Sequence, residues 1–178
     1  MDNLITCSEL RLFEISRTLW LRTYVLNEVR EFKKGKIMHK IIENDFEITE
    51  SDKEFIDYKD IYKIKKIKDQ IDSIGKLFKS TLVRDEKKLL KGKPDGLLNG
   101  KYPVEIKFYD YRKEDKIQAL AYAYLLNTKM SFLVYPNKLL TLELNENHKV
   151  FLQKRINLIY KLKKTLIKGE KLNASTNN

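Results

Sequence analysis

The amino-acid sequence predicts a single α/β or α+β domain in which helices precede a small sheet. Apolar residues recur every three or four positions through most of residues 6–81, as they do on amphipathic helices. Residues 82–108 instead break into short segments separated by glycines, as strands do. The chain has 178 residues, 42% of them hydrophobic, which suits one core better than two large domains. The expected parts of this one domain, 1–178, are a mainly helical region at 1–80, a sheet-containing core at 81–170 and a frayed tail at 171–178.

Three helical patterns occupy the first part. The first spans about 6–32, and Thr6 with Glu9 can form a capping box at its start. The second spans about 35–48. Over 51–81 apolar residues again fall three or four apart while lysines fill other positions, which indicates one or two helices with a basic face.

Strands and helices alternate in the second part. The pair Asn99-Gly100 is a strong signal for a hairpin between two antiparallel strands. Period-2 and helical patterns then predict the remaining elements. The expected strands are at about 82–90, 93–98, 102–108, 130–136 and 139–145, and the expected helices at about 112–127 and 145–168.

The charge favours a polyanionic partner. Lys and Arg number 36 against 25 Asp and Glu, a net charge of +11, so nucleic acid is the first expectation and a merely solubilising surface the alternative. No signal peptide or membrane-length apolar run is present, so a soluble, cytoplasmic protein is expected. Cys7 is the only cysteine, which excludes an intrachain disulfide and a metal site made of four thiolates.

Two charged residues interrupt the apolar segment "PVEIKF". Residues two apart on a strand share a face, so Glu105 and Lys107 project together, and the hairpin can bring Asp95 alongside Glu105. Two converging carboxylates repel unless a cation lies between them, and their hard oxygens favour Mg²⁺ or Mn²⁺. An ordinary strand with a salt bridge between Glu and Lys is the alternative interpretation.

Other polar residues strengthen the first interpretation. Gln118 and Tyr122 are four apart on an expected helix and therefore share a face. His39 follows Gly35 by four residues near the start of another helix, where it is either a core histidine or a further metal ligand.

Together, G-x3-H, D-x9-E-x-K and Q-x3-Y, in this order, resemble the RecB-like branch of the PD-(D/E)XK nuclease superfamily, and "GKPDG" supplies its Pro-Asp. The sequence is closer still to the CRISPR-associated RecB-like nucleases, which generate and trim DNA ends during spacer acquisition. "SELRLFEISRTLWLR" is similar to their N-terminal helix and "INLIYKLKKTLIKGEKL" to their C-terminal one.

The resemblance implies a restriction-endonuclease-like core, a small mixed sheet flanked by helices, with an N-terminal helical region. It also implies a Mg²⁺ or Mn²⁺ cofactor and a role for each motif residue. The implied metal ligands are Asp95, Glu105, the Ile106 carbonyl and His39; the implied catalytic lysine is Lys107; and Gln118 with Tyr122 would position the lysine, the water or the DNA backbone.

The sequence departs from the CRISPR-associated RecB-like nucleases in one respect. Those proteins hold an iron-sulfur cluster with one N-terminal and three C-terminal cysteines. Ser16 stands where the first is expected, the C-terminal trio is missing, and Cys7 cannot replace it, so no cluster is expected. The terminal helices are then expected to pack by hydrophobic contact. The expected contributors are Phe13, Trp20, Leu152, Ile156, Ile159 and Leu162.

The expected function is a metal-dependent DNA nuclease, an exonuclease on single-stranded DNA or DNA ends, associated with CRISPR antiviral defence or a viral relative. Tyr58, Tyr62 and Tyr109 can stack bases, although such tyrosines also serve packing. The alternatives are a non-catalytic DNA-end-binding subunit and a viral decoy of a CRISPR adaptation complex. The partners expected besides DNA are CRISPR integrase subunits and a second copy of the chain.

Overall fold

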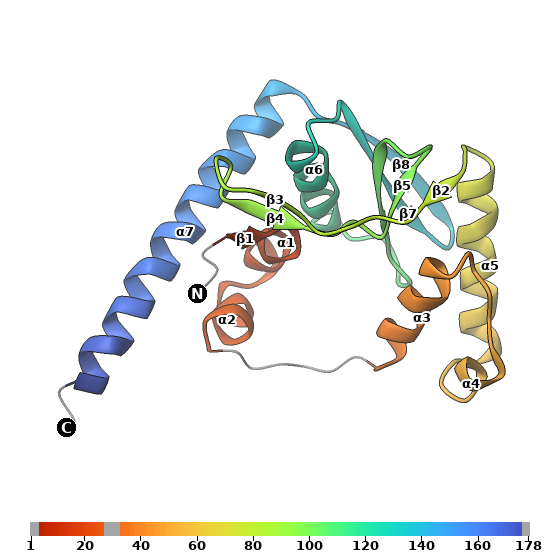
Figure 1. Ribbon diagram of the computed structural model, residues 1–178, viewed down its shortest axis with the longest axis horizontal. Coiled ribbons are helices and arrows are strands. Elements are labelled where there is room, and N and C mark those ends of the chain that lie inside the picture. The colour runs from red at the N-terminus through yellow and green to blue at the C-terminus, as the bar shows by residue number, and fades with distance from the viewer. Residues whose placement is uncertain (1–3, 27–32, 176–178) are drawn as a thin grey trace.

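The computed structural model describes residues 4–26 and 33–175, with side chains as far as 166, and is a mixed α/β fold (Figure 1). The helices are α1 (Cys7–Ile15), α2 (Arg17–Trp20), the π-helical turn η1 (Leu21–Val25), α3 (Lys33–Glu43), α4 (Glu50–Lys53), α5 (Tyr58–Asp72), α6 (Asp115–Leu125) and α7 (Glu146–Ser175). The strands are β1 (Ile5–Thr6), β2 (Leu77–Phe78), β3 (Val83–Asp85), β4 (Leu90–Gly92), β5 (Gly96–Leu98), β6 (Tyr102–Ile106), β7 (Met130–Tyr135) and β8 (Lys138–Glu143).

The first predicted helix is interrupted rather than continuous. Its capping box is confirmed, because Thr6 accepts from the Glu9 backbone N–H and the Glu9 carboxylate accepts from that of Thr6. At Ser16 the backbone is extended, with φ −161°, and the hydroxyl accepts from the backbone N–H of Leu19 at 3.2 Å. A serine that caps a new helix competes with continuation of the old one. The rest of the predicted span, 27–32, lies outside the described residues.

The second predicted helix ends earlier than expected. α3 stops at Glu43, and Asp45 and Phe46 both have positive φ values, 54° and 65°, that a right-handed helix cannot contain. The third predicted pattern forms α4, α5 and the short strand β2. Ile64, Ile67 and Ile71 are the buried face of α5, as the predicted amphipathic spacing requires.

The predicted hairpin is confirmed. Asn99 and Gly100 have φ values of 52° and 68°, the left-handed conformation of the two central residues of a type I′ turn, and β5 pairs antiparallel with β6 across the three-residue connection 99–101. The main sheet has the order β2-β5-β6-β7-β8, with β6 and β7 parallel and the other pairs antiparallel. A smaller sheet, β1-β4-β3, contains the predicted segment 82–90, which a turn divides into β3 and the start of β4.

Helices cover both faces of the main sheet. On one face, Val104 and Ile106 of β6 pack with Ile67 and Ile71 of α5. On the other face, Leu133 of β7 packs with α6, the helix that connects β6 to β7. Glu105, which lies between Val104 and Ile106, therefore points toward α6 and is buried there.

The terminal helices pack together as predicted, at the opposite side of the molecule from α5 (Figure 1). α7 continues to Ser175, past the predicted end at 168, so residues 171–175 are helical rather than a frayed tail. Residues 176–178 lie outside the described residues. The terminal core contains Phe13, Trp20, Leu152, Ile156 and Ile159, with Leu162 packed against it.

Polar contacts also join the termini, which the sequence did not indicate. Glu9 is completely buried and accepts hydrogen bonds from Trp20 Nε1 at 3.0 Å and from the Thr6 backbone N–H at 3.2 Å. Lys163 Nζ of α7 lies 3.2 Å from Glu9 Oε1. A buried carboxylate thus has the ionic partner that burial demands.

Among the described helices, none combines the length and apolar character needed to span a membrane.

Candidate active site

The hairpin places Asp95 beside Glu105. Gly96 of β5 pairs with Val104 of β6, so the next pair outward along the two strands is Asp95 with Glu105. The Asp95 backbone N–H donates to the Val104 carbonyl at 3.0 Å, and Asp95 Oδ2 accepts from the Ile106 N–H at 2.7 Å. These bonds fix Asp95 alongside Glu105, as the sequence predicted, although the strand expected at 93–98 begins only at Gly96 and Asp95 lies immediately before it.

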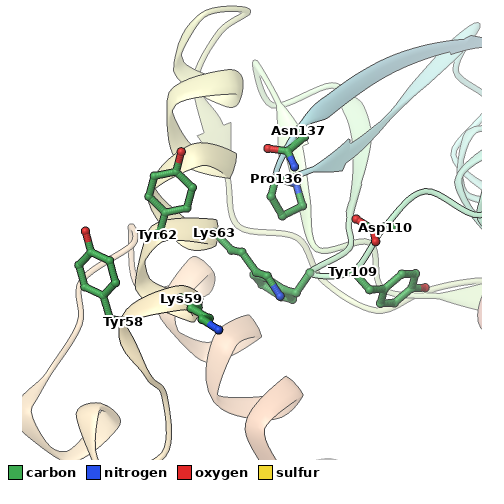
Figure 2. A pocket seen from close by; sticks show the side chains of 9 residues that line it. Tyr58, Lys59, Tyr62, Lys63, Tyr109, Asp110, Pro136 and Asn137 are labelled. Atoms are coloured by element: carbon green, nitrogen blue, oxygen red, sulfur yellow. The ribbon is translucent and has the colours of Figure 1, made fainter.

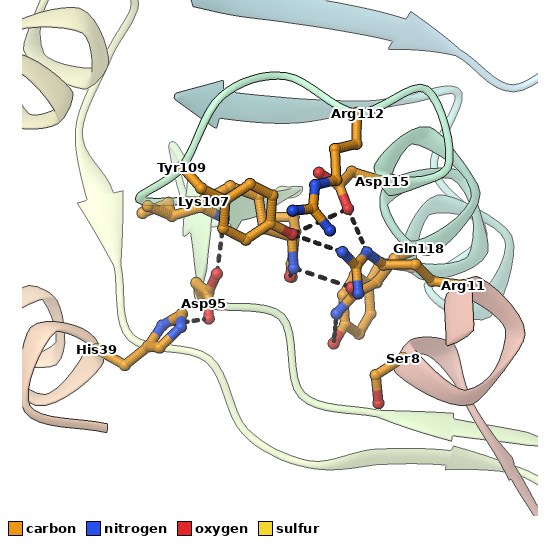
Figure 3. Close-up of polar contacts among 12 residues, drawn as sticks. Ser8, Arg11, His39, Asp95, Lys107, Tyr109, Arg112, Asp115 and Gln118 are labelled. Carbon is orange, nitrogen blue, oxygen red and sulfur yellow. Dashed lines mark hydrogen bonds and ion pairs between the residues drawn. The ribbon is translucent and has the colours of Figure 1, made fainter. Parts of the chain in front are cut away.

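Lys107 lies between the strand and α6. Its Nζ is 2.5 Å from Glu105 Oε1 and 3.0 Å from Gln118 Oε1 (Figure 3). The Lys107 backbone N–H donates to the Val134 carbonyl at 2.9 Å, continuing the pairing of β6 with β7. The ammonium group is therefore held by one carboxylate and one amide oxygen.

Gln118 and Tyr122 extend this chain of contacts along one face of α6. Gln118 Nε2 lies 3.4 Å from the Tyr122 hydroxyl, which donates to the Lys93 carbonyl at 3.0 Å. Lys93 belongs to the segment that leads to Asp95. Helix α6 therefore supports both Lys107, through Gln118, and the loop before β5, through Tyr122. Gly92 makes this possible, because a Cβ at that position would lie 2.6 Å from the Tyr122 ring.

His39 reaches the same centre from α3. Its Nδ1 lies 3.0 Å from Asp95 Oδ1, and its ring meets the Phe108 ring edge-on with centroids 5.5 Å apart. The sequence could not tell a core histidine from a site histidine, and the structure places it in contact with the site. The six predicted side chains thus form two contacting groups, His39 with Asp95, and Glu105 with Lys107, Gln118 and Tyr122. The Ile106 backbone N–H joins Asp95 to β6, the strand that carries Glu105.

Burial makes the charges of the site interdependent. Burial and then the charge of Asp95 raise the pKa of Glu105 to about 7, although Lys107 acts in the opposite direction. Burial also acts to raise the pKa of Asp95, but the charge of His39 and its hydrogen bond outweigh burial and hold that pKa below its usual value. For Lys107 burial favours the neutral amine, yet the charge of Glu105 raises its pKa and keeps it a cation.

The donor set fits a hard divalent cation. Asp95 and Glu105 repel each other strongly enough to alter the pKa of Glu105, and a cation between two carboxylates removes that conflict. Carboxylate oxygens suit Mg²⁺ or Mn²⁺. The oxygens are nevertheless paired with His39 and Lys107 in this structure, and within the described part of the chain no three His, Cys, Asp or Glu side chains form a ready group of metal ligands.

A second polar cluster, which the sequence analysis missed, supports the first turn of α6. Asp115 is completely buried and accepts from the Tyr109 hydroxyl at 3.0 Å and the Tyr135 hydroxyl at 2.8 Å. Arg11 of α1 donates to Asp115 through Nε and to the Tyr109 hydroxyl through a terminal nitrogen at 2.7 Å (Figure 3). The available signal was the spacing of Asp115, three residues before Gln118 on the same helix face.

This cluster also changes the interpretation of Tyr109. The sequence grouped Tyr109 with Tyr58 and Tyr62 as exposed aromatic residues that can stack bases. Tyr109 is half-buried with its hydroxyl bonded to Asp115 and Arg11, whereas Tyr58 and Tyr62 are exposed. Tyr109 is therefore a structural link between the end of β6 and α6.

Comparison with models of protein families and with curated proteins finds no significant match to this chain. The function is therefore inferred from the chemistry of the site. Its distinctive content is a buried Glu in contact with a Lys, an Asp that the hairpin pairs opposite that Glu, and a Gln and a Tyr behind the lysine.

Proposed function

We propose that the protein is a metal-dependent deoxyribonuclease that hydrolyses phosphodiester bonds, acting as an exonuclease on single-stranded DNA or DNA ends. The observation that supports this most is the position of Lys107 Nζ, 2.5 Å from Glu105 and 3.0 Å from Gln118, in a centre that also contains Asp95 and His39. A salt bridge between Glu105 and Lys107 that served the fold alone would not need Gln118 and Tyr122 as further polar partners behind the lysine.

Each side chain has a role in this proposal. Lys107 stabilises the negative charge that develops on the phosphate during attack, because a fixed cation in a buried site needs little reorganisation. Gln118 orients Lys107, and Tyr122 orients Gln118. Asp95 and Glu105, with His39, hold Mg²⁺ or Mn²⁺, which when bound supplies a water of lowered pKa and positive charge beside the phosphate.

The substrate follows from charge and from the resemblance of the motifs. A net charge of +11 favours a polyanion, and lysines dominate the exposed side of α5. A role beside CRISPR integrase subunits rests on the sequence resemblance alone.

The deciding experiment is cleavage of end-labelled single-stranded and duplex DNA with Mg²⁺, Mn²⁺ or EDTA. Wild type is expected to cut only with metal, and Asp95→Ala and Lys107→Ala are expected to abolish cutting. Lys161→Ala, on exposed α7, removes the same charge away from the site and serves as the control. If wild type binds DNA but cuts nothing with either metal, the catalytic proposal fails and a DNA-end-binding subunit replaces it.

A further inference from the structure

A cavity of about 400 Å³ opens beside the proposed site, between α5 and the segments that follow β6 and β7 (Figure 2). Its wall contains Tyr58, Lys59, Tyr62 and Lys63 from α5 and Phe108 from the segment that follows β6. A volume of this size falls in the range of small-molecule sites, about 300–1,000 Å³, and is large enough for a nucleotide.

The two tyrosines are exposed to a degree that packing does not explain. Tyr58 is 81% exposed and Tyr62 is 51% exposed, and neither belongs to a core cluster. They are four residues apart, so they stand one above the other on the same side of α5. Burying aromatic rings is normally favourable, so leaving both in water has a cost that a ligand would recover.

A second cavity, of about 470 Å³, lies on the other side of the same two tyrosines, with Lys65 and Lys66 in its wall. Tyr58 and Tyr62 thus form a ridge with a hollow on each side. Lys66 Nζ lies 5.5 Å from the centre of the Tyr62 ring, so a cation stands beside one of the two aromatic surfaces.

From this arrangement we infer that Tyr58 and Tyr62 are a stacking site for unpaired bases of single-stranded DNA, with Lys59 and Lys63 binding the adjacent phosphates. Bases stack on aromatic side chains only when they are not covered by base-pair neighbours, and a row of lysines follows the backbone charge. The inference rests on the proposed nuclease function and adds where the strand lies next to the site.

The charges beside the tyrosines are available to a ligand. Within the described residues, neither Lys59 nor Lys63 has an ion-pair partner. Lys34 of α3, by contrast, pairs with Asp60 at 2.5 Å. One carboxylate, that of the exposed Asp110, also lines the cavity. Two lysines against one aspartate leave a net positive wall.

The stacking site is continuous with the proposed site. Phe108 lines the cavity and also contacts His39, whose Nδ1 lies 3.0 Å from Asp95 Oδ1, with ring centroids 5.5 Å apart. Phe108 directly follows Lys107 in the chain. A strand whose bases lie on Tyr58 and Tyr62 therefore passes beside the reacting centre.

The test is fluorescence anisotropy with a labelled oligothymidylate of about 12 nucleotides, measured in EDTA so that cleavage plays no part. Tyr58→Ala/Tyr62→Ala is expected to weaken binding by roughly tenfold or more, since stacking contributes a factor of about 5 to 150 per base. Tyr58→Phe/Tyr62→Phe keeps the rings and is expected to bind like wild type. Phe151→Ala removes an exposed aromatic residue from α7 and is the control.

The lysines are tested by salt dependence. Lys59→Ala/Lys63→Ala is expected to reduce the slope of log K against log salt by about 1.4, since each phosphate contact on a single strand contributes about 0.7. Lys154→Ala/Lys161→Ala removes two exposed charges from α7 and should leave the slope unchanged. The tyrosine variants should also keep the wild-type slope, because stacking releases no counterions.

The inference is overturned if Tyr58→Ala/Tyr62→Ala binds as tightly as wild type, or if Phe151→Ala weakens binding equally. Either result can occur while wild type still cuts DNA, and then the proposed function stands without this stacking site. Conversely, a wild type that binds through the tyrosines but cuts nothing loses the nuclease proposal and keeps the DNA site.

Discussion

Arg11 on α1 and Asp115 on α6 form an ion pair although 104 positions separate them in the sequence. The Asp115 side chain is completely buried, and that of Arg11 is 17% exposed. The pair fixes the start of α6, the helix that presents Gln118 and Tyr122, against the N-terminal helix. The N-terminal region is thus part of the support of the candidate site.

Replacing Asp115 is therefore expected to be costly. Asp115→Ala should lower the free energy of unfolding by about 3 kcal/mol, because it leaves a largely buried guanidinium without its partner. Two tyrosine hydroxyls, of Tyr109 and Tyr135, lose their acceptor as well. Urea unfolding followed by circular dichroism measures the loss.

The matched control is Asp72, whose 56% exposed carboxylate pairs with Lys68 on the surface of α5. Asp72→Ala should cost about 0.5 kcal/mol, as exposed helix pairs do. Equal losses in the two variants would show that the Asp115 cluster contributes no more than a surface pair.

Gln118 is expected to act through Lys107. Gln118→Ala removes the amide oxygen 3.0 Å from Lys107 Nζ, so it should lower kcat of DNA cleavage by about 10- to 100-fold, the usual effect of losing an orienting partner. KM should change little, because a group that acts only in the transition state does not alter substrate binding. Steady-state cleavage kinetics measure both constants.

Gln153→Ala supplies the comparison, since Gln153 bonds the Tyr124 hydroxyl on the outer side of α6 and should leave kcat unchanged. A Gln118 variant with higher KM and normal kcat would contradict the orienting role and indicate a direct contact with DNA.

Gly92 and Tyr122 are expected to be coupled. Gly92→Ala places a methyl group 2.6 Å from the Tyr122 ring and should cost about 1 to 3 kcal/mol of stability through overpacking. In a Tyr122→Leu background the same change should cost about 1 kcal/mol less, which a double-mutant cycle by urea unfolding detects. Additive effects would place the strain at Cys7, whose Sγ would lie 3.0 Å from the new methyl group.

Local periodicity predicted the parts of the site that lie within one element. The two-residue period of a strand placed Glu105 and Lys107 on one face, and the four-residue spacing of a helix did the same for Gln118 and Tyr122. The turn chemistry of Asn99-Gly100 predicted the hairpin that aligns the two carboxylates, and Asn99 adopts the required positive φ.

Contacts between distant elements could not be obtained in this way. Arg11 and Asp115 each look like an ordinary polar residue on an amphipathic helix, and no local pattern pairs them. The break at Ser16 was missed because the helical spacing of apolar residues continues across it, and only its hydrogen bond to the Leu19 N–H identifies it as a cap. Burial of Glu9 likewise depends on Lys163, far along the chain.

Metal binding is expected to stabilise the fold. A ligand at about 100 times its dissociation constant adds about 2.7 kcal/mol to the free energy of unfolding, which corresponds to a Tm increase of roughly 5 to 10 °C for a domain of this size. Thermal unfolding with Mn²⁺ or Mg²⁺ should show this increase in wild type and its loss in Asp95→Asn and Glu105→Gln. Asp69→Asn, an exposed position on α5, should respond like wild type. Equal Tm increases in all four proteins would place the bound metal elsewhere and leave Asp95 and Glu105 as partners of His39 and Lys107 only.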